Sequence, residues 1–108
     1  KGHSVTLDDS ENIITVTDGS NRLDMKGKDG SVELTCKSKL TIKVGSGVTI
    51  SCDGNSGAVT IKTNSKVEIN SDKVGIKASG EASFEGTGSL TAKSSGMLTL
   101  KGSMTKIN

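Results

Sequence analysis

The stretch from Val32 to Ile42 reads VELTCKSKLTI and contains the pattern that decides the fold. Two apolar residues flank a polar residue at 32–34, and the same triplet returns at 40–42. Twelve such triplets follow one another along the chain, at a mean spacing of about 8.5 residues. Their apolar pairs are Val5/Leu7, Ile14/Val16, Leu23/Met25, Val32/Leu34, Leu40/Ile42, Val48/Ile50, Val59/Ile61, Val67/Ile69, Val74/Ile76, Ala82/Phe84, Leu90/Ala92 and Leu98/Leu100. Alternation with a period of two is typical of strands that bury one face, so the sequence predicts an all-β protein.

The residues inside and between the triplets support this prediction. The middle residue is polar in 11 of the 12 triplets, and Gly75 is the exception. Residues that form turns separate the triplets, among them Asp18-Gly19, Asp29-Gly30 and Ser79-Gly80. Apolar residues nowhere recur with a helical period. We therefore expect the middle residues to form an outer, solvent-facing wall.

The composition argues against a compact monomeric enzyme. The chain has 108 residues, of which 31% are hydrophobic, and its aromatic content is one residue, Phe84. Gly, Ser and Thr fill 42 positions, and Trp, Tyr and Pro are absent. A monomeric domain of this size normally needs larger apolar side chains for its core. Disorder is also disfavoured, because 14 basic and 12 acidic residues nearly cancel and β-branched residues are plentiful.

A sandwich or barrel is the usual reading of many short strands, but every connection here is short and aromatic residues are missing. A solenoid fits better, yet eight extended residues span only about 26 Å, which is one side of a triangular prism. Three chains would complete the perimeter, and each strand's neighbours would then belong to the other two copies. At about 4.8 Å per strand, the prism would be a needle of roughly 60 Å. Folding and trimerisation would be coupled.

Five stretches of the sequence resemble a known family. They are the repeats 74–80 and 98–103, the opening segments 2–9 and 14–18, and the ending 104–108. Together they resemble the C-terminal needle of contractile injection spikes. These are the VgrG proteins of type VI secretion, the baseplate spike proteins of phages and the spikes of extracellular injection systems.

The resemblance implies an intertwined homotrimeric triple-stranded β-helix, which acts mechanically to puncture a target cell and is not an enzyme. It implies a hub and tube of the tail at the N-terminal end, a PAAR-repeat protein at the C-terminal tip and a target cell envelope. No cofactor is expected. Some phage spikes bind a metal through His-x-His motifs at the tip, but the only histidine here is His3 at the opposite end, so no tip metal is expected. The net charge of +2 is too small to indicate nucleic-acid binding. Assembly would occur in the bacterial cytoplasm, followed by incorporation into a virion tail or a secreted or injected particle. The chain, which begins at Lys1, would be a fragment of a larger spike or a processed product.

The same interpretation divides the chain into three parts. Residues 1–31 form a neck with the first strands, 32–103 form the regular triple-stranded β-helix, and 104–108 form a blunt tip. We expect the cap protein to bind a set of residues at and just below this tip. These are Leu100, Gly102, Met104, Lys106, Ile107 and Asn108.

Several other residues could have a specific function, but a structural role explains each of them better. His3 is expected to be a neck residue rather than a metal ligand. Cys36 and Cys52 continue inward-facing phases and are expected to be small buried side chains, with a disulfide between chains as the alternative. Residues 53–57 resemble the start of a calcium loop but lack its later carboxylate, so a plain turn is expected. Four lysines should point outward: Lys43, Lys62, Lys77 and Lys101.

Three other functions remain open at this stage. The first is the stalk of a trimeric phage fibre or adhesin, although glycan binding usually needs exposed aromatic residues and Phe84 is predicted to face inward. The second is a polysaccharide-degrading enzyme on a trimeric β-helix, although the paired carboxylates of glycosidases are not apparent. The third is a monomeric solenoid such as an ice-binding protein.

Overall fold

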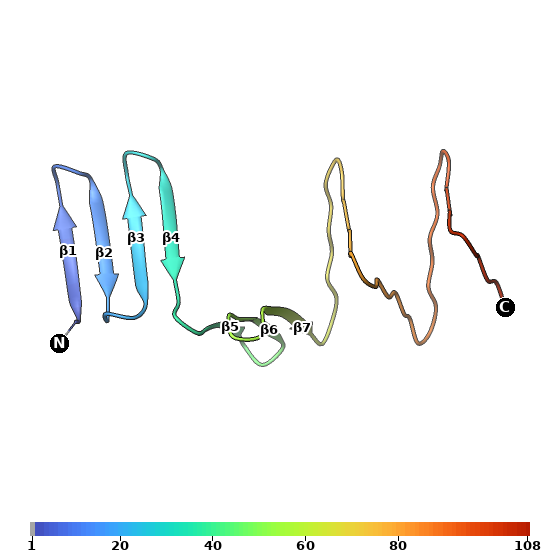
Figure 1. Ribbon diagram of the computed structural model, residues 1–108, viewed down its shortest axis with the longest axis horizontal. Helices are drawn as coiled ribbons and strands as arrows, with labels where there is room; N and C mark the ends of the chain where they lie inside the picture. Colours follow the sequence, from blue (N-terminus) through green and yellow to red (C-terminus); the bar gives the residue numbers. More distant parts are fainter. Residues whose placement is uncertain (1) are drawn as a thin grey trace. The chain divides into compact units, whose positions relative to one another are not determined.

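The structure is a computed structural model that describes residues 2–108. Seven strands lie in the N-terminal part of the chain (Figure 1). They are β1 (Ser4–Asp8), β2 (Ile13–Thr17), β3 (Arg22–Lys26), β4 (Ser31–Thr35), β5 (Lys39–Val44), β6 (Val48–Asp53) and β7 (Ala58–Thr63). The first seven apolar triplets fall inside these strands, one triplet to each strand. The all-β prediction is therefore confirmed.

The strands form two antiparallel meanders. One sheet has four strands in the order β1-β2-β3-β4, and the other has three in the order β5-β6-β7. Within each sheet, consecutive strands pair along their whole lengths, so that each apolar residue lies opposite apolar residues of the next strand, with few exceptions. Between residues 2 and 108 no helix is long and apolar enough to cross a bilayer.

The pairing corrects one prediction. The sequence predicted that the neighbours of each strand come from two other chains, but β1–β7 pair with neighbours of the same chain. The reason lies in the connections, because each of the five hairpin loops contains one residue with a left-handed backbone. These residues are Asn12, Gly19, Gly30, Gly45 and Gly57, with φ between 56° and 95°. A left-handed residue lets a short loop reverse the chain, so the following strand returns beside the preceding one.

Residues 64–108 differ from the first part of the chain. They contain the last five apolar triplets, yet none of these triplets belongs to a strand. No residue described after Gly57 has a left-handed backbone. The chain divides into two units, one ending at Ile69 and the other spanning Asn70–Asn108. The second unit consists of extended stretches and bends that have no strand partner within the chain.

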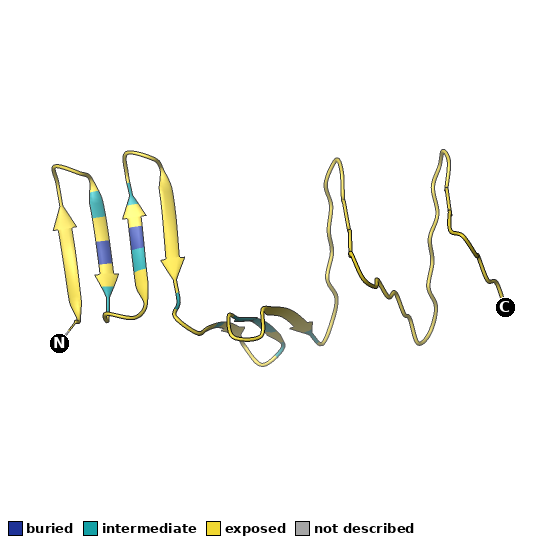
Figure 2. Cartoon of the chain, in the orientation of Figure 1, coloured by how far each residue is buried: buried dark blue, intermediate teal, exposed yellow. Residues whose placement is uncertain are grey.

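The single chain has no apolar core. Among the described residues, no hydrophobic side chain is buried, and exposure prevails along most of the chain (Figure 2). The only buried residues described are polar: Thr15 is 8% exposed and Asp24 is 4% exposed. Both are middle residues of triplets and were expected on the solvent-facing wall. They are buried because β2 and β3 are the central strands of the four-stranded sheet, and neighbouring side chains cover them.

Candidate assembly surfaces

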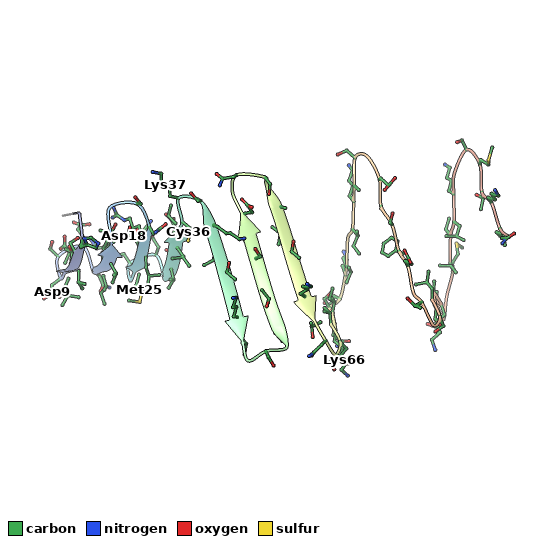
Figure 3. The ribbon with its side chains drawn as sticks, turned by 90° about the horizontal axis from the view of Figure 1, so that it is seen from below. Asp9, Asp18, Met25, Cys36, Lys37 and Lys66 are labelled. Atoms are coloured by element: carbon green, nitrogen blue, oxygen red, sulfur yellow. The ribbon has the colours of Figure 1, made fainter. Side chains whose placement is uncertain are left out.

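One face of the four-stranded sheet carries eight apolar side chains, and we call it the apolar face. Its members are Val5, Leu7, Ile14, Val16, Leu23, Met25, Val32 and Leu34. They form two rows across the strands. The register places Val5, Val16, Leu23 and Leu34 in one row, and Leu7, Ile14, Met25 and Val32 in the other. Side chains project from both sides of the sheet (Figure 3). The apolar face is open, with Val5 70% exposed and Leu34 52% exposed.

The first of these rows lines a shallow hollow. Val5, Val16, Leu23 and Leu34 form its floor, and its volume is about 560 Å³. His3 lies at its edge, together with polar residues of the β2–β3 loop. The hollow runs across all four strands, so it is a feature of the whole sheet rather than of one hairpin.

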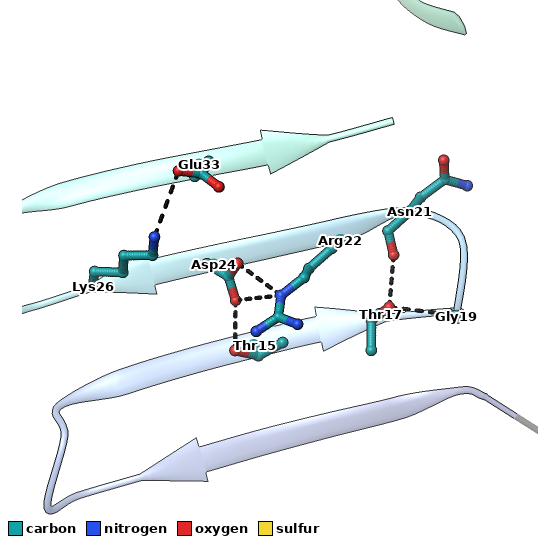
Figure 4. A network of polar contacts seen from close by, with 8 residues as sticks. All are labelled: Thr15, Thr17, Gly19, Asn21, Arg22, Asp24, Lys26 and Glu33. Atoms are coloured by element: carbon teal, nitrogen blue, oxygen red, sulfur yellow. Dashed lines mark hydrogen bonds and ion pairs between the residues drawn. The ribbon is translucent and has the colours of Figure 1, made fainter. Parts of the chain in front are cut away.

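The opposite face of this sheet holds a polar network around Asp24 (Figure 4). The Thr15 hydroxyl donates a hydrogen bond of 2.6 Å to Asp24 Oδ1, and Arg22 Nε lies 2.8 Å from Asp24 Oδ2. The Arg22 and Thr15 hydrogen bonds hold the pKa of the Asp24 carboxyl below its usual range. An adjacent ion pair joins Lys26 to Glu33 across β3 and β4 at 3.5 Å. The network therefore binds β2, β3 and β4 together on the face away from the apolar side chains.

The β2–β3 loop is held by hydrogen bonds to one carboxylate. Asp18 Oδ1 accepts bonds from the backbone N–H groups of Asn21 at 2.7 Å and Ser20 at 2.8 Å. These bonds, the Asn21 bond foremost, lower the pKa of Asp18 to about 2. The Asn21 side chain in turn accepts a bond of 3.0 Å from the backbone N–H of Lys37, just after β4. This end of the sheet is thus linked from β2 to the chain leaving β4.

The other end of the sheet is held by contacts between two loops. The backbone N–H of Gly27 donates a bond of 2.8 Å to the carbonyl of Asn12, and Lys28 lies 3.4 Å from Glu11. These contacts join the β1–β2 loop to the β3–β4 loop. Both ends of the four-stranded sheet are therefore fixed within a single chain.

The three-stranded sheet also has an apolar face, and Cys52 lies on it, whereas Cys36 follows β4. Cys52 lies in register between Leu40 and Val59, as its predicted inward phase requires. Cys36 and Cys52 are free thiols, half-buried rather than buried. Both line one hollow of about 230 Å³ next to Leu34 and Leu40.

The residues predicted to bind a cap protein are all exposed. Leu100 is 75% exposed, Met104 is 84% exposed and Ile107 is 87% exposed. Gly102, Lys106 and Asn108 are exposed as well. None of the six belongs to a strand, and the single chain does not gather them into a defined surface. Their predicted role stays a prediction.

Three other predictions can be compared with the structure. Residues 53–57 form a turn in which Asp53 accepts backbone hydrogen bonds from Asn55 and Ser56, as expected for a plain turn. Within residues 2–108 no group of three or more His, Cys, Asp or Glu side chains could hold a metal ion. Phe84, predicted to face inward, is 66% exposed in the single chain. The four lysines predicted to point outward are exposed: Lys43, Lys62, Lys77 and Lys101.

The sequence interpretation missed the residues that hold the four-stranded sheet together. Arg22 and Asp24 are two positions apart on one strand and so share a face, which is visible in the sequence. Their contact with Thr15 could be found only once the β2–β3 hairpin register was known. The contact of Asn21 with Asp18 agrees with the turn signal at Asp18-Gly19, whereas the contact of Asn21 with Lys37 had no comparable sequence signal.

The chain was compared with known proteins in three ways. A scan against protein-family models, a search of curated proteins and a search of solved structures each gave no match.

Proposed function

We propose that this chain is the needle of a contractile injection spike, built from three copies, in which residues 64–108 form a triple-stranded β-helix. The needle acts mechanically and is not an enzyme. It passes through the envelope of a target cell, carries a PAAR-type protein at its C-terminal end and joins the hub and tube of a tail at its N-terminal end. It is assembled in the bacterial cytoplasm before release in a virion tail or an injected particle.

One observation carries the assembly of several copies in this proposal, namely the surface that the single chain leaves exposed, while the role as a spike rests on the sequence resemblance. The exposed surface has an accessible area of 10161 Å². A folded monomer of 11.0 kDa would expose about 5,600 Å², so the chain exposes roughly 4,500 Å² more than expected. A standard interface buries about 800 Å² per partner. The excess is therefore sufficient for contacts with two neighbouring copies over most of the chain.

The unpaired triplets of residues 64–108 point in the same direction. Apolar residues such as Val74 and Leu98 alternate with polar ones, as in the paired strands, and they are 57% and 56% exposed. Backbone N–H and C=O groups of an extended stretch need protein partners once an assembly buries them away from water. Strands from two other copies would satisfy those groups and cover the apolar residues on a shared axis, as the triple-stranded β-helix requires.

A mechanical role follows from such an arrangement. A needle whose backbone groups are all paired transmits force along its axis without exposing strand edges to other proteins. At the C-terminal end the last strands lack partners above them. Met104, Lys106, Ile107 and Asn108, with Leu100 and Gly102 beneath, would offer that end to a cap protein.

The test is capture of a purified PAAR-repeat protein by the full chain. We expect one cap protein per three chains, and loss of capture in Ile107→Asp. The control is Lys77→Asp, an exposed lysine away from the tip, which should capture as the wild type does. A trimer that captures no cap protein but binds glycans on an array would instead identify a fibre or adhesin stalk.

A further inference from the structure

We infer that the apolar face of β1–β4 is a self-association surface that packs against the same face of other copies, independently of residues 64–108. The inference rests on the proposed needle and assigns the surface through which its copies first meet. In a fully intertwined fold, strands of different copies would pair with one another. Here the copies would instead meet through side chains of sheets that each chain has already formed.

The chemistry of the surface favours a second copy over other partners. All eight side chains are aliphatic or methionine, and none is charged or aromatic. Nucleic acids require cations, and sugars usually stack on aromatic rings. An equally apolar surface is a matching complement, and every copy of the chain carries one. Closed symmetric assemblies of identical chains are the common outcome of such self-complementarity.

The sheet is complete before it meets another copy. Its four strands are paired in register within one chain. On the face opposite the apolar face, Thr15 and Arg22 hydrogen-bond to Asp24, and hydrogen bonds join the loops at both ends of the sheet. Strand exchange is therefore unnecessary here, and packing of the apolar face is the step that remains.

The dimensions of the sheet suit three copies. Each of its strands has five residues, which extend over about 17 Å. In a three-walled prism with sides of about 17 Å, the axis lies about 5 Å from each wall, half the usual spacing of about 10 Å between packed sheets. Four walls of the same width would leave a hollow centre. The side chains of the apolar face would therefore fill the space between three sheets.

The first experiment compares two adjacent residues of β4 in the full chain. Leu34 belongs to the apolar face and Thr35 to the opposite face, and both are exposed in the single chain. Sedimentation equilibrium should show that Leu34→Asp raises the dissociation constant at least about 100-fold, because it buries an unpaired carboxylate. Thr35→Asp should associate as the wild type does. Circular dichroism checks that each variant keeps the strand signal of residues 4–63.

The second experiment changes the C-terminal part alone. The Leu98→Asp variant should still associate, and it should lose hydrogen-exchange protection only in residues 64–108. The Thr99→Asp variant should keep both its association and its protection. Association that is unaffected by Leu34→Asp, or abolished by Leu98→Asp, would overturn the inference while leaving a homotrimeric needle intact. A wild-type assembly that Leu34→Asp dissociates but that contains two copies would support the apolar face and contradict the proposed needle.

Discussion

Residues 4–63 and 64–108 carry the same apolar triplets but behave differently in a single chain. The first region forms seven paired strands, whereas the second forms none. Hydrophobic alternation therefore does not decide whether a triplet finds a partner within the chain. The loops differ, because every hairpin of the first region contains a left-handed residue and no residue described after Gly57 has one. The left-handed loop residues therefore mark the places where the next strand returns beside the last one.

The two regions also differ in how their polar residues are used. In the first region, buried and loop carboxylates accept hydrogen bonds that join strands and loops, as Asp18 and Asp24 do. In the second, the polar residues described are exposed. We therefore expect the first region to respond to point changes as a folded sheet does, and the second to respond mainly through assembly. The four predictions below test that difference.

Acid should weaken the first region most. The pKa values of Asp8, Asp18 and Asp24 are all lowered by hydrogen bonds in the folded sheet, that of Asp18 to about 2. A carboxyl with a lower pKa in the folded state binds fewer protons than the unfolded state between its two pKa values. Its stabilisation is present above about pH 4 and is lost as the pH falls toward 2.

Hydrogen exchange of the β1–β4 amides at pH 5 and pH 2.5 measures this loss. Protection should fall at the lower pH, and Asp18→Asn should reduce the fall because its side chain does not titrate. Protection that stays constant or rises on acidification would contradict the assignment of these carboxylates to the folded sheet.

Thr15→Val should lower the free energy of unfolding more than the same change at Thr91. Thr15 is 8% exposed and donates to Asp24 at 2.6 Å, so removal of its hydroxyl should lower the free energy of unfolding by about 1.5–3 kcal/mol. Thr91 is the exposed middle residue of a late triplet, and Thr91→Val should change it by less than about 0.5 kcal/mol. Urea unfolding followed by circular dichroism gives both values. Equal values would show that Thr15 is not held as described.

Gly30→Val should destabilise the chain, whereas Gly80→Val should not. Gly30 has φ 68° and open space around its Cα, so the cost of about 1–2 kcal/mol arises from the left-handed backbone alone. Gly80 also has open space but no left-handed backbone. Urea midpoints of the two variants measure the difference. A larger effect at Gly80 would mean that the turns of the second region are the more demanding ones.

The smallest effects are expected at exposed ion pairs in either region. Lys28→Ala removes a 3.4 Å pair with Glu11, and Lys66→Ala removes a 3.0 Å pair with Glu68. Pairs between exposed side chains contribute about 0–1 kcal/mol, so both variants should unfold within that range of the wild type. A loss well above it at Lys28 would indicate that the contact between the two loops holds the sheet more strongly than its geometry implies.

The sequence was sufficient to predict the strands of the first region but not their partners. Triplet alternation is local, and it located all seven strands. A spacing of eight or nine residues suits both a hairpin and a step between copies, so spacing alone left pairing open. Asp-Gly pairs at 18–19 and 29–30 were the visible signal for hairpins, because such pairs favour tight reversals.

The buried polar residues were harder to predict than the apolar ones. Thr15 and Asp24 look like ordinary wall residues until the hairpin places them opposite each other, nine positions apart. The candidate tip depends on a different kind of information. Residues such as Met104 and Ile107 are exposed in one chain, and under the proposed function their contacts would come from other copies and a cap protein rather than from local sequence.

The most direct test of the account is the mass of the wild-type chain in solution, measured by sedimentation equilibrium over a wide range of concentrations. A trimeric needle should sediment as a species of about 33 kDa, three times the 11.0 kDa of one chain. A single species of 11.0 kDa at every concentration would contradict it.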